Sequence, residues 1–80
     1  MWKKNMSPEA AAQVIERFLA SESDYPQEWN DFVETRQQDQ AVELYRKRCY
    51  ELDPLVNRPD PQEQSAVEEL HSIIQKLRTP

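Results

Sequence analysis

The clearest helical pattern in the chain lies in residues 60–78, DPQEQSAVEELHSIIQKLR. Asp60 is suited to cap a helix, Pro61 to occupy its first position, and Glu63 to close a capping box. Apolar residues then recur at spacings of three and four, the period of one helix face: Ala66, Val67, Leu70, Ile73, Ile74 and Leu77. Acids lie in the first half of the segment and bases at its end, as the helix dipole favours. We predict a helix over residues 61–78.

A second helix is predicted upstream of this segment, over residues 40–52, with Asp39 as its cap. Its apolar residues again recur at spacings of three and four, with Ala41 beside them: Val42, Tyr45, Cys49 and Leu52. Pro54 predicts the end of this helix. The segment that follows is interrupted by prolines but contains the apolar residues Leu55 and Val56. We therefore expect it to form one helical turn that packs against the rest of the protein.

The first half of the chain predicts two further helices, over residues 8–21 and 26–35. Ser7 as a cap and Pro8 at the first helical position predict the start of the first helix, and Pro26 predicts the start of the second. Their apolar residues each form one stripe: Ala11, Val14, Ile15, Phe18 and Leu19 in the first, and Trp29, Phe32 and Val33 in the second. Because the second stripe has the densest aromatic content, Trp29 and Phe32 are expected at the centre of the core.

These elements predict an all-α protein, a compact irregular bundle of about four helices. With 80 residues the chain forms a single helical domain, 1–80, and residues 1–6 form an N-terminal arm. The helix over 26–35 is too short for a regular four-helix bundle. We expect Trp2, a large indole in the arm, to fold back onto the bundle.

Composition excludes several classes of function. Glycine is absent, which excludes the phosphate-binding loops that depend on it. The net charge of −5 disfavours nucleic acid and anionic membranes as partners. One cysteine and one histidine cannot fill a zinc site of the usual type, so no metal and no cofactor is expected. With neither an apolar leader nor a spanning segment, the sequence predicts a cytoplasmic protein.

The residues that could support catalysis also have simpler roles. Cys49 is in phase with the apolar stripe of its helix and is expected to be buried, whereas His71 lies about 100° from the centre of its own stripe and is expected on the surface. Glu68 and Glu69 diverge on their helix and are expected to point into solvent. The acids Asp39, Glu43, Asp53 and Asp60 lack the loop of a calcium site. The sequence therefore does not predict an enzyme.

The run Arg46, Lys47 and Arg48 is the one local basic feature, and Arg58 lies nearby. These four residues define one alternative function, weak binding of nucleic acid. Consecutive residues fan around a helix, however, and Glu43 and Glu51 are placed to pair with Lys47 and Arg48. The sequence favours a solvated, salt-bridged face.

Two apolar residues in the same helix, Leu44 and Tyr50, lie off its core stripe by about 80° to 130°. With Arg48 at the edge of the stripe, they are the candidate partner-binding residues, because tyrosine and arginine are enriched where proteins meet. The sequence thus favours a small protein–protein interaction or regulatory module whose partner is another protein. A second alternative is an acidic inhibitor, antitoxin-like, whose carboxylates imitate phosphate.

Overall fold

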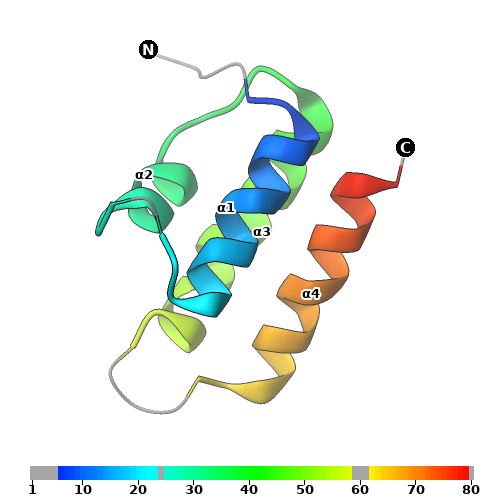
Figure 1. Ribbon diagram of the computed structural model, residues 1–80. Coiled ribbons are helices and arrows are strands. Elements are labelled where there is room, and N and C mark those ends of the chain that lie inside the picture. The colour runs from blue at the N-terminus through cyan, green and yellow to red at the C-terminus, as the bar shows by residue number, and fades with distance from the viewer. Residues whose placement is uncertain (1–5, 24, 59–61, 80) are drawn as a thin grey trace.

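The computed structural model describes residues 6–23, 25–58 and 62–79. In these ranges the chain forms four helices and no strand (Figure 1): α1 (Pro8–Ala20), α2 (Glu28–Glu34), α3 (Gln40–Val56) and α4 (Gln64–Arg78). The all-α, compact bundle predicted from the sequence is confirmed. The expected position of Trp2 and the expected cap at Asp60 and Pro61 fall outside the described residues.

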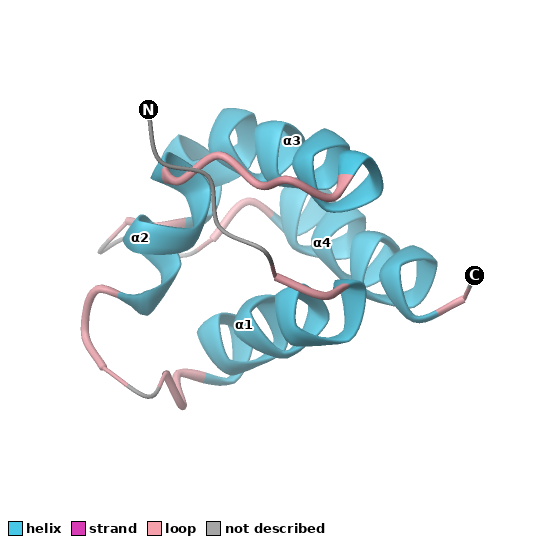
Figure 2. Cartoon of the chain, turned by 90° about the horizontal axis from the view of Figure 1, so that it is seen from above, coloured by secondary structure: helices cyan, strands magenta, loops and turns pink. Residues whose placement is uncertain are grey.

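The helices pack around one core. α1 packs most extensively against α4, and the two run antiparallel in Figure 1. α2 contacts α1 and α3, and α4 contacts the same two helices from the other side. Seen from above in Figure 2, α1 and α3 lie on opposite sides of the bundle. This leaves one long side of α3 without a neighbouring helix in the described part of the chain.

The helix ends that were predicted best are fixed by capping hydrogen bonds between residues close in sequence. Ser7 caps α1, because its Oγ accepts a hydrogen bond from the Ala10 N–H at 3.1 Å. Asp39 caps α3 by accepting from the N–H groups of Ala41 and Val42 at 2.9 and 3.0 Å. α1 ends at Ala20, and the residue that follows it, Ser21, adopts the left-handed conformation with φ of 58°. Both predicted caps are confirmed.

Two predicted helices are shorter than expected. α2 begins at Glu28, not at residue 26, because Tyr25 to Gln27 form a turn in which the Glu28 N–H donates to the Tyr25 carbonyl at 3.1 Å. α4 begins at Gln64, not at residue 61. The Glu63 N–H there donates to the carbonyl of Leu55 at 2.9 Å, which ties the start of α4 to the end of α3.

The predicted end of the third helix at Leu52 is wrong, because α3 continues through Pro54 to Val56. A proline in a helix removes one N–H donor. Two gains offset this loss: Val56 is buried in the core, and the Asn57 N–H closes the last turn by donating to the Asp53 carbonyl at 2.8 Å. Val56 packs down as expected, whereas Leu55 stays exposed.

The core brings all four helices together, and Trp29 of α2 is one of its buried residues. The indole is buried and stacks on Phe18 of α1, with ring centroids 4.0 Å apart, and it also contacts Phe32 at 6.2 Å. Its Nε1–H donates to Asp53 Oδ1 of α3 at 2.6 Å. The expectation that Trp29 and Phe32 belong to the core is confirmed.

The buried face of α1 is wider than its predicted stripe. Ala12 is fully buried although it lies outside that stripe, because α1 contacts all three other helices. Conversely, Phe18, Leu19 and Tyr45 are only partly buried, and Ala41 at the start of α3 is exposed. The sequence therefore located the core correctly but not its edges.

Four arginines each connect a different pair of neighbouring helices. The bridges run around the bundle in a closed order: Arg17 of α1 to Glu28 of α2, Arg46 of α3 to the Val33 carbonyl of α2, Arg48 of α3 to Glu69 of α4, and Arg78 of α4 to Glu9 and Glu16 of α1. Guanidinium groups suit this use, because their planar fork can bind a carboxylate through two parallel hydrogen bonds. We call these contacts the arginine circuit.

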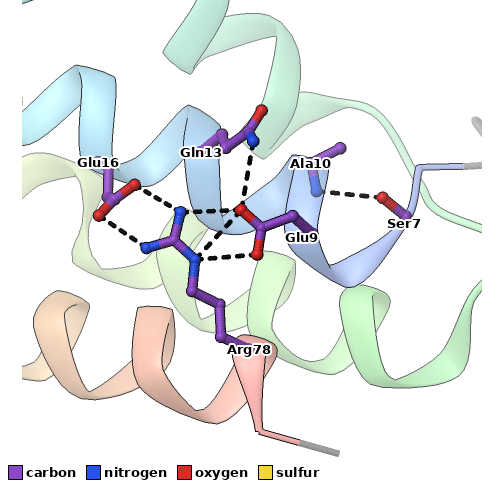
Figure 3. Close-up of polar contacts among 6 residues, drawn as sticks. All are labelled: Ser7, Glu9, Ala10, Gln13, Glu16 and Arg78. Carbon is purple, nitrogen blue, oxygen red and sulfur yellow. Dashed lines mark hydrogen bonds and ion pairs between the residues drawn. The ribbon is translucent and has the colours of Figure 1, made fainter.

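The best-connected bridge joins α4 to α1 (Figure 3). Arg78 Nη2 lies 2.9 Å from Glu9 Oε2 and 2.6 Å from Glu16 Oε1, and Nη1 lies 2.8 Å from Glu16 Oε2. Gln13 donates a further hydrogen bond to Glu9 at 3.2 Å. The hydrogen bonds from Arg78 hold the pKa of both carboxyls below the ordinary glutamate value of 4.5.

Replacing Trp29 with alanine is expected to destabilise the protein by about 3 to 5 kcal/mol, because it removes a buried aromatic ring and its packing. A domain of this size has about 5 to 15 kcal/mol in total, so much of its stability would be lost. Urea denaturation followed by circular dichroism measures the change. The control is Gln75→Ala at an exposed position of α4, expected within about 0.5 kcal/mol of the parent. A Trp29→Ala variant that melts like the parent would show that α2 is peripheral.

The variant Arg78→Gln is expected to be less stable than the parent at neutral pH, with the difference shrinking in acid. Because the folded-state pKa values of Glu9 and Glu16 are lowered, their contribution is present above pH 4.5 and is lost as the pH falls through those folded-state values. Urea midpoints measured from pH 7 downward test this. The control is Arg36→Gln, because Arg36 is exposed and lies outside the group formed by Arg78, Glu9 and Glu16. A difference that stayed constant with pH would contradict an ionic origin.

Candidate functional site

Exposed apolar side chains gather on α3. Among the described residues the large hydrophobic side chains that remain exposed are Tyr25, Leu44, Tyr50 and Leu55, and the last three lie on this helix. Leu44 is 63% exposed and Tyr50 58% exposed, so neither is covered by another part of the described chain. The expectation that both lie off the core stripe is confirmed.

The helix geometry places Leu44 and Tyr50 on the two flanks of the side of α3 that faces away from its core stripe, which we call the outer side. They are six residues apart, which is a rotation of about 120° between them at 3.6 residues per turn. Leu44 lies on one line with Arg48 and with Leu55, which is 39% exposed. Sequence analysis missed Leu55 because the helix was expected to end before Pro54. Its spacing from Leu44 and Arg48 places it on this line only once the helix continues through that proline.

Arg48 is anchored between two carboxylates. Its Nη1 donates to Glu51 Oε1 at 3.0 Å, its Nη2 donates to Glu69 Oε1 at 2.9 Å, and its Nε also donates to Glu69. These bonds raise the pKa of Arg48 and lower that of Glu69. The predicted pairing with Glu51 is confirmed. The expectation that Glu69 points into solvent is wrong, because the packing of α4 on α3 brings it within reach of Arg48.

Arg46 is a core residue and not part of a surface patch. It is buried, its Nη1 donates to the Val33 carbonyl at 2.7 Å, and its Nε and Nη2 donate to the two oxygens of Glu43 at 3.0 and 2.5 Å. Glu43, expected to pair with Lys47, thus pairs with Arg46, which lowers its pKa. The reason is that Arg46 turns toward the end of α2, where a helix carbonyl needs a donor.

A groove runs beside Tyr50, between the end of α2 and α3. It has a volume of about 850 Å³ and is lined by Glu34, Thr35, Arg36, Arg46, Lys47, Tyr50 and Glu51. The tyrosine supplies an aromatic wall, and charges of both signs surround it. A second groove of about 880 Å³ lies on the surface along α1 and α4, and its lining includes His71, Glu16 and Arg78.

The residues considered for catalysis or metal binding have other roles. Cys49 is fully buried, and burial raises the pKa of its thiol to about 12, while His71 is exposed on α4, as predicted for both. Asp39 caps α3, and Asp53 accepts from Trp29. In the described ranges no three acidic, histidine or cysteine side chains are arranged to hold a metal ion. Asp60 falls outside those ranges.

Cys49 is expected to react with a thiol reagent far more slowly in the native protein than in denaturant. The thiolate is the reacting form, and both burial and the raised pKa keep its population low. Absorbance with a chromogenic disulfide reagent, at neutral pH and with or without urea, measures the two rates. Labelling of the native protein at the denatured rate would show that the buried face of α3 does not stay packed against the core.

The outer side of α3 therefore combines apolar area, an aromatic ring and an anchored arginine, which is the composition of a contact surface. None of the helices in the described ranges has the length and apolar character needed to cross a bilayer. Comparisons of the chain with family models, with curated proteins and with solved structures find no match.

Proposed function

We propose that this protein is a small cytoplasmic protein–protein interaction or regulatory module, not an enzyme, and that the outer side of α3 is its contact surface. One observation carries the proposal. Three of the four large hydrophobic side chains exposed in the described part of the chain lie on this single helix: Leu44, Tyr50 and Leu55. The other three helices bury their apolar stripes in the core.

The state of Arg48 supports the same surface. An arginine at an interface contributes most when little side-chain freedom is lost on binding. Arg48 is already held by Glu51 and Glu69, yet its side chain remains about half exposed. It can therefore meet a partner without first being ordered, and it lies between Leu44 and Leu55 on the same line of the helix.

The two alternative functions have less support. Weak nucleic-acid binding through Arg46, Lys47, Arg48 and Arg58 would need these charges on the surface, but Arg46 is buried and Arg48 is held by two carboxylates. Phosphate imitation would need an uncompensated row of acids. Several of the acids are instead compensated by arginines: Glu9, Glu16, Glu28, Glu43 and Glu69.

The double variant Leu44→Ala, Tyr50→Ala is expected to lose about 2 kcal/mol or more of partner binding, the scale of an interface hot spot. The partner is first captured from the native source with the parent protein, and calorimetry then compares the affinities of parent and variant. Both replaced side chains are exposed, so the variant is expected to fold, which circular dichroism checks. Tyr25→Ala, an exposed aromatic outside α3, is the control. Unchanged affinity for the folded double variant would contradict the proposed surface.

A further inference from the structure

We infer that the partner that docks on α3 is a second copy of this chain, in an antiparallel pair of α3 helices related by a two-fold axis. The inference rests on the proposed function and names the partner for part of that surface. It is carried by four residues, Leu44, Arg48, Glu51 and Leu55, which we call the α3 seam.

The spacing of the seam is that of a helix that pairs with another helix. Its members follow one another at four, three and four residues, the spacing of the apolar seam in a coiled coil. At 1.5 Å per residue they cover about 17 Å of the helix. All lie toward solvent: Leu44 is 63% exposed, Leu55 39%, and the Glu51 side chain 64%. The seam is thus a continuous line open to another helix.

The α3 seam is complementary to a second copy of itself that runs in the opposite direction. A two-fold axis between residues 49 and 50 places Leu44 opposite the partner subunit's Leu55, and Arg48 opposite the partner subunit's Glu51. The same axis produces each contact twice, as an isologous interface requires. The result is an apolar contact at each end and two attractive charge pairs in the middle.

The alternative parallel arrangement is disfavoured by charge. In register, it would bring Arg48 against the partner subunit's Arg48 and Glu51 against the partner subunit's Glu51. Like charges face to face across an interface cost free energy, so the charges select the antiparallel pair. A second copy of this chain therefore fits the seam in one direction only.

The contacts within one copy are compatible with this pair. Glu69 of α4 occupies Nε and Nη2 of Arg48, and only Nη1 donates to Glu51 of the same helix. In the pair, the partner subunit's Glu51 can approach that Nη1 side while Glu69 keeps its bonds. Two arginines and two glutamates then alternate in a ring across the axis, so each charge lies between charges of opposite sign.

The decisive experiment mixes two charge-reversal variants, Arg48→Glu and Glu51→Arg. Sedimentation equilibrium is expected to show a concentration-dependent dimer for the parent protein. Each variant alone brings like charges together at both central contacts, so each is expected to remain a monomer. Their equimolar mixture restores opposite charges at both contacts in the mixed pair, and the dimer is expected to return. Contacts within a single copy cannot produce this rescue.

A second pair of variants does not depend on the charges. Leu44→Cys and Leu55→Cys place thiols at exposed positions that the antiparallel pair brings together, whereas the native Cys49 is buried. Under mild oxidation the two variants are expected to cross-link to each other, and much less to themselves, because two copies of the same position lie about 17 Å apart along the axis of the pair. Predominant self-linking would indicate the parallel arrangement and overturn the inference.

Tyr25→Ala is the control, because Tyr25 is an exposed aromatic side chain outside α3 and outside the proposed contact surface. It is expected to leave the dimer unchanged. A parent protein that stays monomeric up to millimolar concentration, or a mixture that fails to recover the dimer, would overturn the inference. A monomer that still binds another protein through Leu44 and Tyr50 would overturn the self-pairing alone and leave the proposed function standing.

Discussion

The indole of Trp29 is the contact on which the remaining packing depends. It stacks on Phe18 of α1, donates to Asp53 of α3, and belongs to α2, so a single side chain joins three helices. α2 has only seven residues, far below the length at which an isolated helix is stable in water. Its conformation is therefore maintained by packing through this ring. Once α2 is in place, its Val33 carbonyl provides the acceptor that lets Arg46 be buried.

The features that the sequence predicted well depend on neighbours close in the chain. A serine or aspartate cap needs only the N–H groups two or three residues onward, so Ser7 and Asp39 were recognisable without knowledge of the fold. The helical stripes were recognisable for the same reason, since they arise from the repeat of the helix itself. The end of α3 was mispredicted because a local signal, Pro54, is overridden by the burial of Val56 among residues distant in sequence.

The candidate site could be predicted only in part. Exposure of Leu44 and Tyr50 follows from their phase relative to the core stripe. The ion-pair partner of each charged residue does not follow from this phase. Several acids lie within reach of each base along a helix, and the rotation of the neighbouring helix decides which of them forms the pair. Glu43 thus binds Arg46 and not Lys47, and Glu69 reaches across from α4. Leu55 could not be placed on the seam while the helix was expected to end before it.

The arginine circuit has a consequence for the handedness of the bundle. Apolar contact is non-directional. The same four apolar stripes could therefore also pack with α2 and α4 exchanged, each on the opposite side of the pair formed by α1 and α3. That exchange would give a bundle topology of the opposite hand. That exchange would turn Arg46 toward α4 and Arg48 toward α2, away from the acceptors that each now meets. A buried guanidinium that loses an acceptor is costly. The polar bridges between helices therefore favour one of two topologies of opposite handedness, between which non-directional apolar contact discriminates poorly.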